Sequence, residues 1–236
     1  MSTSTSVLRL ARQALPLIDA ALFPSFNGWG VSIVDSLDTM WIMGLYEEFD
    51  AGLAIVANTT FPTAPVRAPS PSHMILFVEN NLFDVGVMRS HLWLCNEQNK
   101  FVPFFETVIR YLGGLLSAYA LSKDPILLSR ADDLGLALLP AFNTTSGLPV
   151  FSVNTENGNI AQGWTPNSFL AEMLSCQVEY KYLSYLTGRQ GYYEVVENVM
   201  NIMYNTNCTS TNELLPVSWS TEKGLPVGRM SCPFPT

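Results

Sequence analysis

Between Phe105 and Tyr119 the chain reads FETVIRYLGGLLSAY, in which apolar residues recur at the three- and four-residue spacing of an α-helix. The helix is expected over residues 104–121, with its apolar positions at Phe105, Val108, Ile109, Leu112, Leu115, Leu116 and Tyr119. Gly113 and Gly114 lie within it, although each glycine inside a helix costs about 1 kcal/mol relative to alanine. This pair indicates that another backbone or a ligand approaches the helix closely.

Glu106 and Arg110 stand four residues apart on this helix and therefore share one face. Two interpretations are open from the spacing. In the first, the side chains form a surface ion pair beside a tight helix crossing. In the second, Glu106 is a general acid, because apolar surroundings raise the pKa of a carboxyl group and keep it protonated. The nearby guanidinium lowers the same pKa, so the spacing does not give the sign of the net shift.

Four further helices are expected from periodicity and end signals, over residues 35–57, 124–139, 166–188 and 190–204. Asp35 is the expected N-cap of the first, with Asp38 in its first turn, where a carboxylate favours the helix dipole. Asp124 before a proline is expected to cap the second, and Gly188 to end the third. Helices joined by such short turns pack as antiparallel pairs, so the predicted fold class is all-α.

Composition excludes several classes of function. Of 236 residues, 48% are apolar, which is typical of a globular chain, and only 14% are charged, against about 25% in an average soluble domain. The net charge of −8 excludes nucleic-acid binding through clustered lysine and arginine, and also a polybasic membrane anchor. No apolar run approaches the roughly 18 to 20 residues of a transmembrane helix, and the first residues contain no clear signal peptide.

The cysteines and histidines give no metal-site spacing. Cys95, Cys176, Cys208 and Cys232 allow three disulfide pairings, which stay open, and the two histidines, His73 and His91, are too few for a histidine-based zinc site. Three N-glycosylation sequons begin at Asn58, Asn143 and Asn207. Three in one chain favour the secretory pathway.

Three blocks of sequence together resemble class I α-1,2-mannosidases, glycoside hydrolase family 47. The first runs from Gly28 to Leu45 and reads GWGVSIVDSLDTMWIMGL, and the second is the stretch from Phe105 to Tyr119. The third combines SFLAE at residues 168–172 with YLSYLTG at residues 182–188. The blocks occur in the family's order, and a set of this length is far more specific than any short motif.

The resemblance implies an (α/α)7 barrel, a toroid of antiparallel helix pairs with a calcium ion at the floor of a central pocket. Members remove terminal α-1,2-linked mannose from high-mannose N-glycans with inversion, using one carboxylic acid and one carboxylate base. Glu106 falls on the family's acid position and Arg110 on the arginine of the same pocket. Glu172 falls on a glutamate expected to contact sugar hydroxyls. Asp35 and Asp38 belong to the signature, and we interpret both as structural.

The resemblance covers about residues 27–57 and 104–223. The remaining residues, 1–26, 58–103 and 224–236, are atypical of the family. Residues 58–100 and 224–236 are also rich in proline and are expected to be loops. The family chain is roughly twice as long, and its base, calcium ligand and structural disulfide lie in its second half. We therefore expect residues 1–236 to be a single incomplete glycosidase domain, a truncated or mis-spliced gene product with no metal ligand of its own, inactive as it stands.

Two functions follow from this interpretation. The first is the calcium-dependent mannosidase, whose partners are high-mannose N-glycans or glycoproteins of the endoplasmic reticulum, the Golgi or the secreted fraction. The alternative is a non-catalytic relative, lectin-like or part of endoplasmic reticulum quality control, which binds mannose in the same pocket without cleaving it. Intact carboxylates beyond these blocks would favour the first function, and their loss would favour the second.

Overall fold

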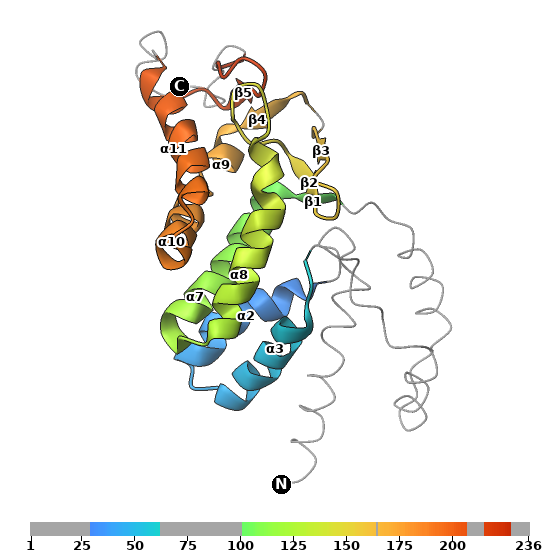
Figure 1. Ribbon diagram of the computed structural model, residues 1–236, viewed down its shortest axis with the longest axis vertical. Helices are drawn as coiled ribbons and strands as arrows, with labels where there is room; N and C mark the ends of the chain where they lie inside the picture. Colours follow the sequence, from blue (N-terminus) through green and yellow to red (C-terminus); the bar gives the residue numbers. More distant parts are fainter. Residues whose placement is uncertain (1–28, 62–100, 164, 207–214, 228–236) are drawn as a thin grey trace, which may run out of the picture.

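The computed structural model describes residues 29–61, 101–163, 165–206 and 215–227, which are mostly helical (Figure 1). The helical segments are α2 (Val31–Ile42), α3 (Tyr46–Asn58), α6 (Phe104–Glu106), the π-helix η2 (Thr107–Leu112), α7 (Gly113–Ser122), α8 (Pro125–Leu138), the 3-10 helix η3 (Leu139–Phe142), α9 (Leu170–Met173), α10 (Gln177–Thr187) and α11 (Gln190–Asn205). Segments α6, η2 and α7 follow one another without interruption. The helix predicted over 104–121 is therefore confirmed, with a π-helical turn directly after Glu106.

Three helical hairpins make up the described layers: α2 with α3, α7 with α8, and α10 with α11 (Figure 1). Helix α2 packs on α7 and α3 packs on α8, while α10 contacts both α7 and α8. The hairpin α7–α8 is therefore the middle of the three, with one hairpin on either side. The predicted antiparallel pairs joined by short turns are confirmed for α7–α8 and α10–α11, whereas the single helix predicted over 35–57 is the hairpin α2–α3.

Glycines bring neighbouring hairpins into close contact. A Cβ atom on Gly114 of α7 would lie 2.6 Å from the carbonyl oxygen of Val34 on α2, so only hydrogen fits at this crossing. A Cβ atom on Gly135 of α8 would lie 2.5 Å from Cδ2 of Leu183 on α10, and the Tyr180 hydroxyl of α10 donates to the Gly135 carbonyl at 3.1 Å. The close approach predicted from the glycine pair is thus the approach of the α2 backbone to Gly114.

Aromatic rings fill the core between the second and third hairpins. Phe104 at the start of α6 meets Phe142 at a centroid distance of 5.2 Å, and Phe142 meets Tyr180 of α10 at 5.8 Å. Tyr180 in turn packs on Tyr192 of α11 at 5.6 Å. Such pairs contribute about 0.5–1.5 kcal/mol each beyond the area they bury, so this cluster fixes α6 relative to α10 and α11.

Two small antiparallel sheets lie together at one end of the helices (Figure 1). The strands are β1 (Phe101–Pro103), β2 (Ser152–Asn154), β3 (Ile160–Ala161), β4 (Asn167–Phe169) and β5 (Ser218–Ser220), in the orders β1-β2-β3 and β4-β5. The pairing places Val102 opposite Val153 and Ser168 opposite Trp219, and all four of these residues are buried. The sheets matter because α6 begins where β1 ends and α9 begins where β4 ends.

The structure corrects the first predicted helix. It begins at Val31 and not at Asp35, because Gly30 takes up the left-handed conformation (φ 74°) at the N-cap. It also ends at Ile42, and Gly44, with φ 73°, lies in the turn before α3. Asp35 and Asp38 therefore lie in the second and third turns of α2, so the capping and dipole roles predicted for them are wrong.

The structure also corrects the helix predicted over residues 166–188, which is β4, the short helix α9 and then α10. The strand forms because Ser168 is buried, donates its hydroxyl to the Pro149 carbonyl at 2.5 Å and pairs with β5. These partners are distant in the sequence, so helical periodicity could not reveal them.

Two other predicted helix ends are confirmed. The Asp124 side chain accepts from the Ile126 N–H at 2.9 Å, and Gly188 ends α10 with φ 72°. Of the predicted loops, residues 62–100 and 228–236 lie outside the described residues.

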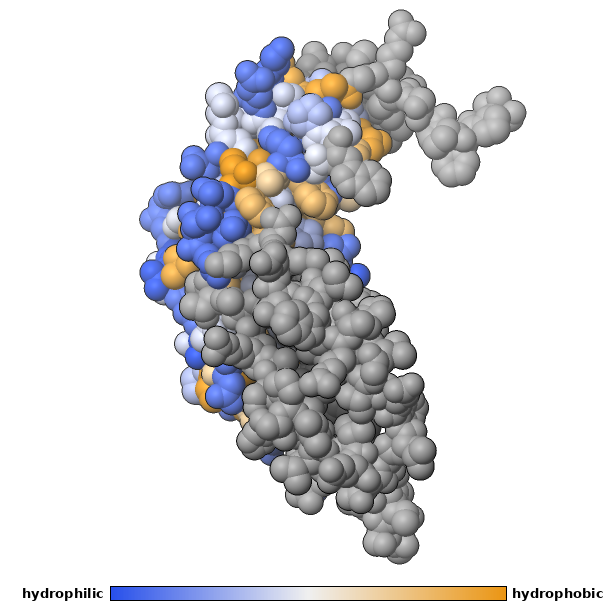
Figure 2. All heavy atoms as spheres, turned by 90° about the vertical axis from the view of Figure 1, so that its right-hand side faces the viewer, coloured by the Kyte–Doolittle hydropathy of each residue, from blue (hydrophilic) through white to orange (hydrophobic). Residues whose placement is uncertain are grey.

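Apolar side chains on the face shown in Figure 2 form several separate patches among hydrophilic ones. The most exposed large apolar side chains of the described residues include Ile42 and Met43 at the end of α2, Val178 and Tyr185 on α10, and Tyr204 on α11. Among the helices described, none is long and apolar enough to span a bilayer.

Replacing Gly114 with alanine is expected to lower the free energy of unfolding by about 1–3 kcal/mol, because the new methyl group would overlap the Val34 carbonyl. Gly191→Ala is the matched control, since a Cβ atom on Gly191 of α11 meets nothing within 4 Å. That control should raise stability by up to about 1 kcal/mol through helix propensity alone. Chemical denaturation of both variants measures the difference, and equal stabilities would contradict the crossing.

Candidate functional site

Arg110 connects two carboxylates from different helices. Its Nε atom lies 2.7 Å from Oε2 of Glu106, one turn earlier, and its Nη1 atom lies 3.5 Å from Oδ2 of Asp35 on α2. The three side chains are partly exposed, at 40% for Arg110, 34% for Glu106 and 46% for Asp35. Ion pairs this open contribute about 0–1 kcal/mol to stability, so the group is accessible to a ligand but is a weak structural link.

The hydrogen bond from Arg110 to Glu106 is the main cause that raises the pKa of the Arg110 guanidinium. Desolvation opposes this effect, and the charges of Glu106 and Asp35 add to it. A guanidinium is already protonated throughout the physiological range. Arg110 is therefore a permanent cation fixed between two acids.

The strand β1 determines where Glu106 lies. The Phe104 N–H donates to the Phe151 carbonyl at 2.7 Å, and the Thr107 hydroxyl donates to the Pro103 carbonyl at 2.7 Å. These two bonds on either side of Glu106 fix the junction between strand and helix. Glu106 thus lies in the first turn of the helical run.

Asp38, the second aspartate of α2, binds across the same helix crossing. Its Oδ2 atom accepts from the Ser117 hydroxyl of α7 at 2.9 Å, and its Oδ1 atom accepts from the Thr39 N–H at 2.6 Å. The aspartates of α2 therefore contact residues on both sides of Gly114, Asp35 at Arg110 and Asp38 at Ser117. They link α2 to the helix that carries Glu106, which is a structural role different from the one predicted.

Glu172 lies on α9, a neighbour of α6 in the fold. Its Oε2 atom accepts from the Phe169 N–H at 3.2 Å, a bond that caps the start of α9. The half-buried side chain is thus held at the same end of the helices as Glu106, and each acid lies in the first turn after a strand.

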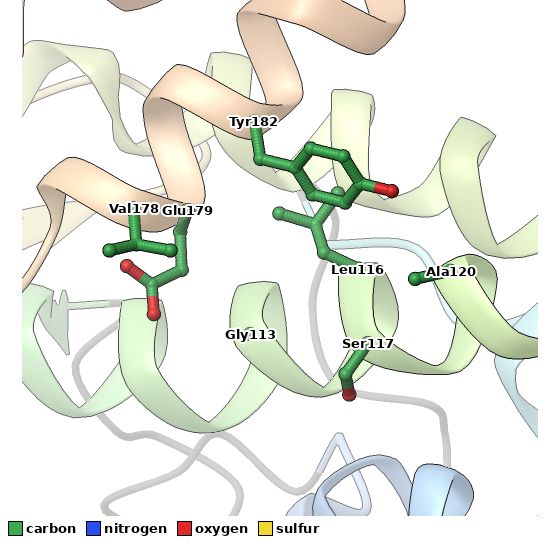
Figure 3. Close-up of a pocket in the computed structure, with 7 residues that line it drawn as sticks. All are labelled: Gly113, Leu116, Ser117, Ala120, Val178, Glu179 and Tyr182. Atoms are coloured by element: carbon green, nitrogen blue, oxygen red, sulfur yellow. The ribbon is translucent and has the colours of Figure 1, made fainter.

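A groove of about 260 Å³ lies between α7 and α10, and it begins at Gly113, about one helical turn after Arg110 (Figure 3). Its lining residues are Gly113, Leu116, Ser117, Ala120, Val178, Glu179 and Tyr182. In Figure 3 the Tyr182 ring lies over Leu116, and the Glu179 carboxylate points from α10 toward the helix that contains Gly113. Apolar walls with a carboxylate at one end are typical of a site for a small polar ligand.

Glu179 is the residue that sequence reasoning missed. Its Oε2 atom is buried and has no hydrogen-bond partner among the described residues, and burial raises the pKa of its carboxyl group. Its Oε1 atom would be 3.6 Å from a Cβ atom on Gly113, three residues after Arg110. The signal was present: Glu179 is the one acid of α10 and stands between Val178 and Tyr180. The argument about apolar surroundings applied to Glu106 applies to it equally.

The part of the chain that the structure describes contains no cluster of metal ligands. Within residues 29–61, 101–163, 165–206 and 215–227, no three His, Cys, Asp or Glu side chains are grouped as a metal ion would require. Cys176 has a free, buried thiol that donates to the Met173 carbonyl, and burial raises its pKa to about 12. The other three cysteines and both histidines lie outside the described residues, so the pairing question stays open.

The chain is similar to known proteins of one family. The model of a family described as Glycosyl hydrolase family 47 matches residues 16–231. The endoplasmic reticulum mannosyl-oligosaccharide 1,2-alpha-mannosidase of Rattus norvegicus is 35% identical over 205 residues, which cover 86% of this chain and 26% of that protein. The protein of the same name from Schizosaccharomyces pombe is 36% identical over 205 residues, covering 86% and 33%. The chain therefore spans about a quarter to a third of the length of these curated relatives.

A solved structure agrees with the sequence relatives. The alpha-1,2-mannosidase from Trichoderma reesei matches with a TM-score of 0.65 and 27% identity, over 85% of this chain and 38% of that chain. The three hairpins described above are thus part of an (α/α)7 barrel, as predicted.

Replacing Glu179 with glutamine is expected to stabilise the protein at pH 7. Because burial raises its pKa above 4.5 in the folded chain, the native state holds the proton more tightly than the unfolded state. Stability therefore falls as the pH rises through the unfolded pKa, and the penalty is complete above the folded one. The gain of the variant should be largest at neutral pH and should vanish below about pH 4.

Thermal unfolding of both proteins from about pH 3 to pH 8 measures this effect. Glu194→Gln, on the exposed side of α11, removes one negative charge without touching the buried carboxylate and serves as the control. A Glu179→Gln variant that is less stable than the parent at pH 7 would show that the carboxylate has a structural partner.

Proposed function

Because this chain belongs to glycosyl hydrolase family 47, we propose that it forms the acid-bearing part of a mannosyl-oligosaccharide 1,2-α-mannosidase. The reaction is hydrolysis of terminal α-1,2-linked mannose from high-mannose N-glycans, with inversion at the anomeric carbon. The names of the relatives, mannosyl-oligosaccharide 1,2-alpha-mannosidases, support the activity and the substrate class. The observation that carries the proposal is the open pair of Glu106 and Arg110 at a strand-to-helix junction, on the helical run that further along lines the groove.

Glu106 is the proposed general acid. Arg110 binds one oxygen of its carboxyl group, Oε2, so we assign proton donation to the other, Oε1. Oε1 delivers the proton to the glycosidic oxygen as the bond to the anomeric carbon breaks. The inverting mechanism also needs a carboxylate about 6.5–9.5 Å away, which activates water on the opposite face of the sugar. That base is assigned to no residue of this chain.

Arg110 is the proposed positioning and substrate-binding residue, since its partly exposed guanidinium lies between the carboxylates of Asp35 and Glu106 and stays accessible to a ligand. Glu172 and Glu179 are proposed to accept hydrogen bonds from sugar hydroxyls. The case is stronger for Glu179, because its buried Oε2 atom lacks a hydrogen-bond partner among the described residues. Burial also raises the pKa of its carboxyl group, so the ionised carboxylate lowers the stability of the folded protein at neutral pH. Ligand binding explains a buried acid that destabilises the fold more readily than packing does.

Calcium dependence belongs to the proposal through family resemblance alone. When bound, the ion would hold sugar hydroxyls and water at the floor of the pocket. The described residues do not fit it, because no three acidic, histidine or cysteine side chains are grouped there, and Asp35, Asp38 and Glu106 are bonded to Arg110 or Ser117. No step of the mechanism above passes through the metal, and its ligands are assigned outside the described residues.

The proposed location is the secretory pathway, where high-mannose N-glycans are trimmed. The endoplasmic reticulum in the names of the Rattus norvegicus and Schizosaccharomyces pombe relatives supports it, and so does the number of sequons in the sequence, three. The proposal extends to glycoproteins carrying such glycans as partners, in the endoplasmic reticulum, the Golgi or outside the cell.

The acid role is tested with Glu106→Gln. The 236-residue chain, joined to the part of the Schizosaccharomyces pombe relative beyond its matched segment, should release mannose from a high-mannose glycan. Glu106→Gln should lower kcat by about 10²- to 10⁴-fold, because glutamine keeps the hydrogen bond to Arg110 but donates no acidic proton. Glycan binding, followed by calorimetry, should change little.

Glu194→Gln is the control and should leave turnover unchanged. Equal kcat values for Glu106→Gln and the parent would remove Glu106 from the acid role. If the joined protein without substitutions binds the glycan and releases no mannose, the result would favour the alternative, a mannose-binding relative. Such a protein needs the groove and its carboxylates to bind the sugar, but it needs no catalytic base.

A further inference from the structure

The sequon Asn143-Thr144-Thr145 forms a tight turn directly after η3. The Asn143 N–H donates to the Pro140 carbonyl at 2.9 Å, and the Thr144 N–H donates to the Phe142 carbonyl at 2.8 Å. The Thr144 hydroxyl donates to the Leu148 carbonyl at 2.8 Å and accepts from the Gly147 N–H at 3.0 Å. The middle residue of the sequon therefore closes the turn.

The two residues that N-glycosylation requires have the opposite character. Asn143 and Thr145 are both exposed, whereas Thr144 between them is partly buried. A glycan on Asn143 would project into solvent, and neither the turn nor the core would have to open to accommodate it. This division of roles within three residues fits an acceptor site.

Room for a sugar lies beside the acceptor amide. A hollow of about 260 Å³ is lined by Asn143, Thr144, Thr145, Ile160, Gln162, Thr221 and Glu222. Amide, hydroxyl and carboxylate groups line it together with one partly exposed isoleucine. Such a surface can bind the polar and apolar faces of a first N-acetylglucosamine.

The sequon at Asn58 is less suited. Asn58 is the last residue of α3, and its side-chain amide donates to the Ala54 carbonyl at 2.7 Å, so the nitrogen that would carry the sugar is already bonded within the helix. The sequon at Asn207 lies outside the described residues.

We propose that Asn143 is an N-glycosylation site of this protein. The side-chain nitrogen Nδ2 forms a bond to C1 of the first N-acetylglucosamine of a lipid-linked oligosaccharide diphosphate. The bond from C1 to the diphosphate oxygen breaks, the lipid diphosphate leaves with the electron pair, and the amide nitrogen loses one proton. The modification rests on the secretory location proposed above, because the oligosaccharide donor is found only there.

The test separates use of the site from location. The full chain is expressed in a eukaryotic cell with a cleavable signal sequence fused to its N-terminus, and cleavage of the signal shows that the chain has entered the endoplasmic reticulum. Glycan release by peptide N-glycosidase in ¹⁸O-water converts a modified asparagine into ¹⁸O-labelled aspartate, which peptide mass spectrometry detects. We expect the label at position 143 in the parent chain.

Three variants give the pattern that only N-glycosylation produces. Thr145→Ser keeps the sequon and should keep the label at Asn143, whereas Thr145→Ala destroys the sequon without touching the asparagine and should abolish it. Asn143→Gln should lack the same glycan, which gel electrophoresis detects as faster migration of the protein. A chain whose signal has been cleaved but whose Asn143 peptide is recovered unlabelled would overturn the proposal. If Asn143 is modified in the chain with the fused signal sequence but not in the chain without it, the result would contradict only the proposed secretory location.

Discussion

The contact between Gly114 and the Val34 carbonyl sets the distance between α2 and the helix that carries Glu106 and Arg110. Because no side chain separates the two helices there, the α2 backbone lies directly against α7. That proximity lets Asp35 reach Arg110, although the two residues are 75 positions apart in the sequence. With a larger residue at Gly114 the helices would separate, and Arg110 would lose its contact to Asp35.

Local signals in the sequence predicted local structure well, and they failed where distant segments decide the conformation. Asp124 and Gly188 end helices as expected, because a cap needs only its neighbouring residues. Asp35 looked like a cap because it precedes an apolar run, but the preceding Val31-Ser32-Ile33-Val34 is helical too, once Gly30 has turned the chain. The strand at residues 167–169 depends on a partner some 50 positions later.

The candidate site divides in the same way. The pairing of Glu106 with Arg110 follows from a four-residue spacing and was predicted as one of two alternatives. Both the ion pair and the tight crossing of the structural alternative are present, so the functional interpretation rests on the adjoining groove and the relatives. Glu179 reaches the site only because α10 packs on η2 and α7, a contact that periodicity cannot predict. The assignment of Glu172 to sugar binding stays a prediction.

The pairing of β1 with β2 has a consequence for how this chain can vary. Glu106 is held by a strand whose partner follows it in the sequence, at Ser152–Asn154, and by hydrogen bonds to residues 103 and 151. None of these restraints runs through the connection between Phe61 and Phe101. A longer connection adds little to the free-energy cost of folding, since each doubling of its length costs only about 0.6 kcal/mol in closure entropy. Insertions and deletions can therefore accumulate there while the acid keeps its position, which makes this segment the natural place for related chains to differ in length.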